Sequence, residues 1–223
     1  MLVPFGFYAL SAVAFLMVIA LLRYADNSRR LINTWLLAGA VWLIFVTIMS
    51  RSGTLADFSL PPRVPLFIVI PAVIAGIIFT GRPSFRSALE KAPLYVPVFF
   101  TSFRIIVELL IYGAYRMGIF PERVTFEGLN FDMLVGLSAI PVGYLLLKGK
   151  LSRSGLLTWN IAALAVLSLT VYSFVSTYYF SDYTSTGSTD FVKFPYVLLA
   201  AVLLPVAVFL HVFSIRQTRS RLG

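Results

Sequence analysis

Residues 2–22 read LVPFGFYALSAVAFLMVIALL, a run of 21 residues that contains no charged side chain. An α-helix rises about 1.5 Å per residue, so about 20 apolar residues are needed to cross a hydrocarbon core about 30 Å thick. The run lacks the basic start, the shorter apolar core and the small-residue cleavage site that mark a secretory signal. We therefore expect Leu2–Leu22 to be a retained transmembrane helix.

The composition of the whole chain extends this expectation. Hydrophobic residues make up 59% of the 223 residues and charged residues 12%, whereas a soluble domain carries about 25% charged residues. A chain with so few charges cannot cover its own surface with polar groups, so the lipid bilayer is its expected partner. The net charge of +9 does not indicate nucleic acid, because the basic residues stand in short groups between apolar runs.

Seven apolar runs of about transmembrane length divide the chain. Their expected bounds are 2–22, 31–50, 64–81, 92–115, 129–147, 155–178 and 194–215. The connections between them are short, which leaves no room for a soluble domain. We predict an all-α polytopic membrane protein in which residues 1–223 form a single bundle of seven transmembrane helices.

Lys and Arg are unevenly distributed between the two sides of these runs. The first, third and fifth connections and the C-terminal tail carry 12 of them, while the opposite side carries 5. Cytoplasmic loops of membrane proteins hold the excess of Lys and Arg. The distribution therefore predicts a C-terminus in the cytoplasm and, since the number of spans is odd, an N-terminus outside.

Prolines fall inside several of the runs. They are Pro71, Pro97, Pro141 and Pro205. Each removes a backbone donor and tends to kink its helix, which membrane helices tolerate when neighbouring groups satisfy the freed carbonyl. Kinks of this kind open cavities in some proteins and only serve packing in others.

The fourth run contains the two most informative polar residues, Arg104 and Glu108. An ionised side chain at the centre of a bilayer costs roughly 2.5–3.5 kcal/mol on insertion scales, so neither should face lipid. Their i, i+4 spacing places them on one helix face, where they can pair, and Tyr112 extends the same stripe. Two interpretations stay open: a structural ion pair that joins helices, or one wall of an outward-facing polar pocket.

A second polar group, Glu127, Asn130 and Asp132, stands at the expected entry of the fifth helix. Asn130 is a good N-cap residue, and the two carboxylates suit the positive end of a helix. Capping explains most of this pattern. The alternative is a polar rim that shares one vestibule with Glu108 and Tyr112.

A third polar group lies toward the cytoplasmic side, with Trp159 and Asn160 near the start of the sixth helix and His211 near the end of the seventh. Asn160 and His211 should lie at similar depth, so they can form an interhelical hydrogen bond. His211 is the only histidine. A single histidine in such a place is more often a donor between helices than a ligand.

Several function classes do not fit these residues, and we assign no catalytic residue, cofactor or metal. Retinal proteins need a lysine in the middle of the last helix, but Lys193 stands at its outer mouth. One histidine cannot supply a metal hydrolase or a bis-histidine haem, and HExxH is absent. The chain also lacks the Pro-Gln signature of SWEET-type sugar transporters, and the equal spacing of Pro65 to Arg86 and Pro195 to Arg216 is weak support for their three-plus-one-plus-three repeat.

Several stretches resemble those of an uncharacterised group of bacterial multi-spanning membrane proteins. They are RIIVE at 104–108, GIFP at 118–121, TFEGLNFD at 125–132, Trp159-Asn160 and Phe194-Pro195-Tyr196. The resemblance implies a bacterial inner-membrane location and no particular activity. Our leading interpretation is a protein that binds or transports a small polar solute or lipid head group. The alternatives are a structural or partner-binding protein and, third, a membrane-embedded enzyme.

Overall fold

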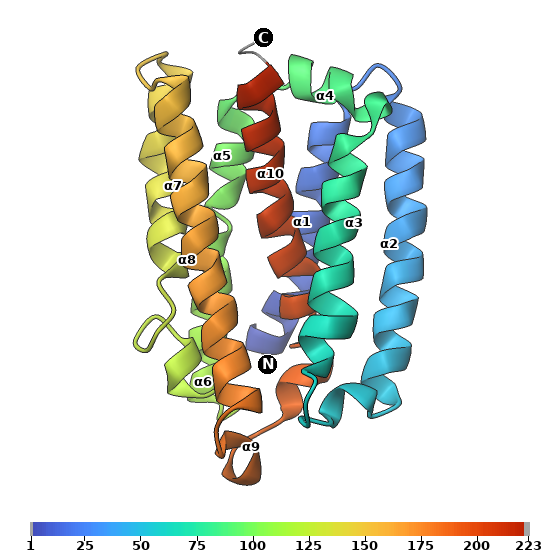
Figure 1. Ribbon diagram of the computed structural model, residues 1–223, viewed down its shortest axis with the longest axis vertical. Helices are drawn as coiled ribbons and strands as arrows, with labels where there is room; N and C mark the ends of the chain where they lie inside the picture. The colour runs from blue at the N-terminus through green and yellow to red at the C-terminus, as the bar shows by residue number, and fades with distance from the viewer. Residues whose placement is uncertain (1, 221–223) are drawn as a thin grey trace.

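The computed structural model describes residues 2–220, which form a bundle of helices without any strand (Figure 1). The α-helices are α1 (Leu2–Leu22), α2 (Ser28–Arg51), α3 (Ile70–Gly81), α4 (Arg86–Lys91), α5 (Tyr95–Thr101), α6 (Arg104–Arg116), α7 (Asp132–Leu147), α8 (Arg153–Tyr179), α9 (Tyr183–Thr186) and α10 (Leu204–Ser220). Two π-helical segments, η2 (Pro65–Val69) and η6 (Leu199–Leu203), lead directly into α3 and α10. The short 3-10 turns are η1 (Thr54–Ala56), η3 (Pro83–Phe85), η4 (Glu122–Val124) and η5 (Asp190–Val192).

Five helical stretches within residues 2–220 are long and apolar enough to cross a bilayer, which indicates a multi-pass membrane protein. They are Leu2–Leu22, Ser28–Arg51, Tyr95–Arg116, Arg153–Tyr179 and Leu199–Ser220. The stretch Pro65–Gly81 passes the same test only together with Pro83–Lys91, from which it is bent by 73°. The remaining apolar helix, α7, has 16 residues and is shorter than a full span.

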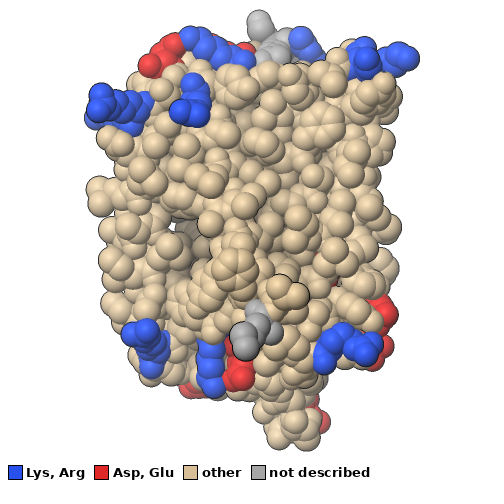
Figure 2. All heavy atoms as spheres, turned by 180° about the vertical axis from the view of Figure 1, so that it is seen from behind, with Lys and Arg blue, Asp and Glu red and all other residues tan. Residues whose placement is uncertain are grey.

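Charged side chains gather at the two ends of the bundle. On the face shown in Figure 2, Lys, Arg, Asp and Glu form an upper and a lower rim, and the broad belt between them carries none. The C-terminus lies at the same end as α4, and the N-terminus lies at the opposite end (Figure 1). Of the 12 basic residues assigned to the first of these ends, Arg221 lies outside the described residues.

The expected fourth helix, 92–115, is broken into α5 and α6. At the break, the amides of Ser102 and Phe103 donate to carbonyls three residues earlier, at 3.1 Å each, as in a 3-10 turn. A Cβ atom on Gly136 of α7 would lie 2.9 Å from the backbone nitrogen of Ile105, so α7 approaches the chain closely at this point. The break makes Arg104 the first residue of α6.

Two helices begin later than their apolar runs predict. Helix α7 begins at Asp132 rather than residue 129, because residues 122–130 fold into a compact turn in which the amide of Asn130 donates to the carbonyl of Thr125. The last run was expected to be helical from Phe194, but residues 194–197 form turns and η6 begins at Leu199. Apolarity marks the depth of a segment in the bilayer, but it does not mark where the helical hydrogen bonds begin.

The proline in α10 explains a contact that fastens α2 to the bundle. Pro205 has no amide hydrogen to offer the carbonyl of Ala201, four residues earlier. The indole Nε1 of Trp42 in α2 donates to that carbonyl instead, at 2.9 Å. A side chain from a neighbouring helix thus satisfies the freed backbone group, as a bilayer interior requires.

We expect Trp42→Phe to lower the free energy of unfolding by about 1 kcal/mol, because interhelical hydrogen bonds in membrane proteins contribute about 0.6 kcal/mol on average and up to about 1.7. Trp35→Phe is the matched control, since the Nε1 of Trp35 is buried without a hydrogen-bond partner among residues 2–220. Thermal unfolding in detergent measures both variants. Equal losses in the two variants would refute the role given to the Trp42 hydrogen bond.

Candidate functional site

The charged residues of the fourth and fifth runs meet in the middle of the bundle. The guanidinium of Arg104 holds the carboxylate of Asp132 in α7 by two contacts: Nε donates to Oδ2 at 2.5 Å, and Nη2 forms an ion pair with Oδ1. Both residues are buried, with exposed fractions of 1% and 4%. Two parallel contacts of this kind fix the relative orientation of the two groups. The expected Arg104–Glu108 ion pair is not formed.

The guanidinium also reaches the last helix. Its Nη1 lies 3.1 Å from Nε2 of His211 in α10, and Nδ1 of His211 lies 2.8 Å from Oδ1 of Asn160 in α8. The amide of Asn160 donates to the hydroxyl of Ser214 at 3.0 Å. Because a guanidinium only donates hydrogen bonds, Nε2 of His211 must accept, so the neutral ring carries its hydrogen on Nδ1.

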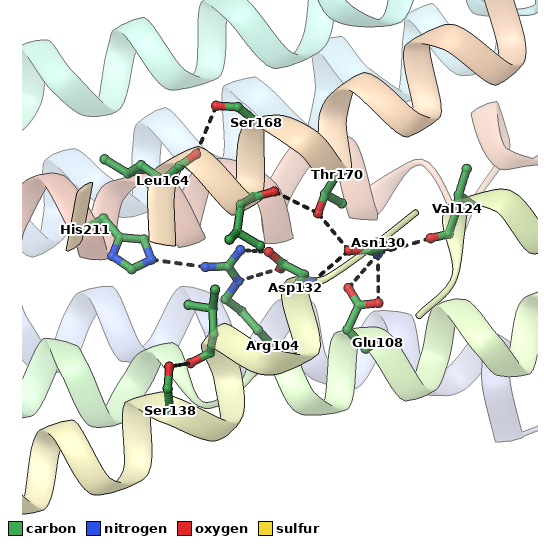
Figure 3. A network of polar contacts seen from close by, with 12 residues as sticks. Arg104, Glu108, Val124, Asn130, Asp132, Ser138, Leu164, Ser168, Thr170 and His211 are labelled. Atoms are coloured by element: carbon green, nitrogen blue, oxygen red, sulfur yellow. Dashed lines mark hydrogen bonds and ion pairs between the residues drawn. The ribbon is translucent and has the colours of Figure 1, made fainter. Parts of the chain in front are cut away.

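The expected hydrogen bond between Asn160 and His211 is therefore present, but these residues do not form a separate cluster. Asn160 is joined through His211 to Arg104, and Figure 3 shows the continuation of this network from His211 through Arg104 to Asp132. Trp159 lies beside this network, with its ring centroid 5.4 Å from that of His211. Its Nε1 donates to the hydroxyl of Ser138 in α7 at 3.1 Å.

Glu108 lies at the other end of the network and takes its hydrogen bonds from Asn130. The amide nitrogen of Asn130 lies 2.9 and 2.8 Å from the two carboxylate oxygens of Glu108 and also donates to the carbonyl of Val124 at 3.1 Å. The amide oxygen of Asn130 accepts from the backbone of Asp132 at 3.0 Å and from the hydroxyl of Thr170 at 2.7 Å. Asn130 thus ties α6, α7 and α8 together (Figure 3).

Asn130 was expected to be the N-cap of the fifth helix, and this assignment needs correction. Phe131 occupies the capping position of α7. Asn130 precedes it and accepts the amide of Asp132, the first helical residue, in an Asx-type turn. Its side chain is then positioned to serve Glu108 and Thr170 as well.

A cavity borders this network. Its volume is about 80 Å³, and η2, α6, α8 and η6 supply most of its lining. Four residues of the network are among its lining, although the surface that faces the cavity is almost entirely apolar; they are Arg104, Glu108, Asp132 and Thr170. The other lining residues are apolar, apart from Tyr179. One water needs roughly 10–15 Å³ by this measure, so the cavity has room for a few waters or a solute of a few heavy atoms.

Six of the nine predicted site residues do not line the cavity; they are Tyr112, Glu127, Asn130, Trp159, Asn160 and His211. Tyr112 stacks on Phe126 with ring centroids 4.9 Å apart and does not line the cavity. Glu127 is exposed. The vestibule expected to unite Glu127, Asn130, Asp132, Tyr112 and Glu108 is therefore reduced to its three buried members, Glu108, Asn130 and Asp132.

Thr170 and Ser214 are two network residues that the sequence pattern does not indicate, and Thr170 is the one that contacts Asn130. Thr170 lies in the middle of α8, where a threonine ordinarily bonds to the carbonyl of its own preceding turn. Its hydroxyl does lie 3.3 Å from the carbonyl of Val166, but the contact to Asn130 is shorter. Helix α8 contains several other Ser and Thr residues, and nothing in the sequence distinguishes the hydroxyl of Thr170 from theirs.

Within residues 2–220, no group of three or more acidic or histidine side chains is placed to hold a metal ion. The network instead offers one carboxylate without a cationic contact, Glu108, beside a cavity. No family model, curated protein or solved structure matches the chain.

Proposed function

We propose that this chain is a bacterial inner-membrane protein of seven transmembrane helices that binds and moves a small polar solute through the cavity beside Glu108. The observation that carries the proposal is the position of Glu108. Its carboxylate is fully buried, borders the cavity and takes hydrogen bonds only from a neutral amide.

The distribution of charge supports the proposed orientation. The end that holds the C-terminal tail carries 12 basic residues in the sequence and two acidic ones, Asp26 and Glu90, whereas the opposite end carries five of each. Because Lys and Arg concentrate on the cytoplasmic side of membrane proteins, the tail belongs in the cytoplasm and the N-terminus outside.

Two short segments complete the proposed seven spans. Pro65–Gly81 and α7 each fall short of about 20 residues. A short hydrophobic segment is accommodated by local thinning of the bilayer or by flanking residues that reach the interface, at fractions of a kcal/mol per Å. Each of the two segments contacts other helices of the bundle, α3 against α10 and α7 against α5 and α6.

The charge of the network suggests the chemistry of the solute. Arg104 and Asp132 neutralise each other, which leaves Glu108 as the buried acid without a counter-ion in contact. A buried carboxylate is stable when it is protonated or when a cationic group joins it. We therefore favour a small solute with a positively charged or hydrogen-bond-donating group that meets Glu108 from the cavity.

The test is a thermal-shift screen of small amines, guanidines and neutral polar solutes against the purified protein in detergent. We expect a cationic solute to raise the melting temperature of the wild type and to lose at least tenfold in apparent affinity with Glu108→Gln, since one lost charge contact exceeds about 1.4 kcal/mol. Glu122→Gln, at an exposed acid, is the matched control.

A structural role is the second candidate, and the closed set of contacts around Arg104 favours it. All partners of the guanidinium are side chains of the bundle, from α7 and α10. If Glu108→Gln and Arg104→Ala both lose stability while no solute shifts the melting temperature of the wild type, the network only joins helices and the solute proposal is wrong.

A further inference from the structure

A second and larger cavity lies on the other side of the bundle, away from the charged network. It has a volume of about 880 Å³ and lies between α2 on one side and α1, α3, η6 and α10 on the other. Figure 2 shows an opening on the left of the apolar belt. Because this view is turned by 180°, that side corresponds to the right side of Figure 1, where α1, α2 and α3 are drawn. Ligand pockets commonly have volumes of about 300–1,000 Å³, so this cavity can hold a sizeable ligand.

The cavity has the length and polarity of a space for an acyl chain. Its lining on α2 extends from Thr34 to Thr47, which at about 1.5 Å per residue corresponds to roughly 20 Å along the helix. One leaflet of the hydrocarbon core is about 15 Å thick, half of the total of about 30 Å. The cavity is therefore long enough to hold an acyl chain along α2. Most of the lining is apolar, including Phe15, Phe79 and Phe209.

Cationic side chains stand at both ends of this cavity: Arg82 lines it at the end that holds α4, and two more lie at the opposite end. A smaller cavity there is lined by Arg51, Lys193 and Ser50 together with Tyr8, Thr47 and Phe194. The last three residues also line the large cavity, so the two spaces adjoin. Lys193 pairs with Asp190 at 2.7 Å, whereas Arg51 has no ion-pair partner within residues 2–220.

A buried hydroxyl next to the end that holds Arg51 and Lys193 points to a ligand with polar groups below its head. The Oγ atom of Ser11 has no hydrogen-bond partner in the described chain, although Ser11 is only 7% exposed and lines the large cavity. Ser11 follows Tyr8 by three residues, so it lies about one helical turn further into the bundle. An unpartnered buried hydroxyl is costly unless something outside the chain accepts its hydrogen.

We propose that the large cavity holds the acyl chains of a phospholipid whose phosphate lies between Arg51 and Lys193. In this arrangement Ser11 donates to an ester carbonyl, and the chains extend between α2 and the rest of the bundle. Arg and Lys both bind phosphate well, and the apolar lining matches hydrocarbon. This site is separate from the cavity beside Glu108 and does not depend on the solute proposed there.

Native mass spectrometry of delipidated protein in detergent tests this proposal. Phosphatidylglycerol is the probe, diacylglycerol with the same chains is the phosphate-free comparison, and inorganic phosphate tests the head group alone. We expect phosphatidylglycerol to bind and the double variant Arg51→Gln, Lys193→Gln to bind it about tenfold to thirtyfold more weakly, as two lost charge contacts imply. The matched double variant Arg116→Gln, Arg123→Gln at the same end should bind as the wild type does.

A second pair of variants tests the space for the chains. Ala75 lines the cavity, and its neighbour Ile74 is exposed and does not. Ala75→Trp should abolish phosphatidylglycerol binding, whereas Ile74→Trp should preserve it. The proposal is overturned if diacylglycerol binds as tightly as phosphatidylglycerol, if only inorganic phosphate binds, or if Ala75→Trp binds phosphatidylglycerol as tightly as the wild type does.

Discussion

Arg104→Ala is expected to lower the free energy of unfolding by about 3–5 kcal/mol, the usual cost of removing one partner from a buried ion pair. The loss arises because Asp132 keeps its charge in the bundle interior without the two contacts from Arg104. The Nε2 atom of His211 also loses its donor. Unfolding in detergent, followed by helical circular dichroism, measures the effect, and Arg116→Ala at the exposed end of α6 is the control.

Removing both charges separates the cost of an unpaired charge from the contribution of the pair itself. The double variant Arg104→Leu, Asp132→Leu should be more stable than Arg104→Ala, since buried pairs replaced by apolar residues are often close to neutral. A double variant as unstable as the single variant would show that the geometry of the pair, and not its charge balance, holds α6 against α7.

Asn130→Ala is expected to destabilise the protein by about 2–4 kcal/mol, because it leaves several buried groups without partners at once. Both oxygens of Glu108 lose their donor, and the hydroxyl of Thr170 loses its acceptor. The same unfolding measurement applies. Asn33→Ala, at an exposed position of α2, gives the baseline for an asparagine that takes no part in the network.

An aspartate at the same position provides a sharper test with almost no change of shape. Asn130→Asp replaces the amide that faces Glu108 with an oxygen, so two carboxyl groups meet in the bundle interior. We expect a loss at least as large as that of Asn130→Ala, and partial recovery when Glu108→Gln is added. If Asn130→Asp has wild-type stability, the arrangement of Glu108 and Asn130 described here is wrong.

The prediction of an all-α chain with several membrane-spanning helices is confirmed, because the thickness of a bilayer dictates the length of an apolar run, whereas the number of seven spans stays a prediction. The sequence predicted the starting residues of the helices less well. The break at Ser102–Phe103 depends on the close approach of Gly136, which lies more than thirty residues further along the chain. The late start of α7 depends on a turn closed by Thr125 and Asn130. Neither contact is visible in the apolar pattern.

The sequence indicated most of the buried polar residues that the structure brings together, but it also included Tyr112 and Glu127, which lie apart, and it did not indicate the pairings. Helical spacing correctly suggests that Arg104 and Glu108 share a face, and it therefore favoured a pair within α6. The guanidinium pairs with Asp132 instead, because α7 begins at that residue and packs against α6. The contact between Arg104 and His211 joins residues 107 positions apart, so no local pattern could have indicated it.

The π-helical segment η6 has a consequence for the angular phase of the final helix. A π turn contains one residue more than an α turn, and each residue turns an α-helix by about 100°. The side chains beyond Leu203 are therefore rotated by about that angle relative to an uninterrupted α-helix. That rotation directs the imidazole of His211 at Arg104 and the carboxamide of Gln217 at the carbonyls of Leu89 and Ala92. One additional residue near the beginning of the last segment thus sets which neighbours its far end can reach.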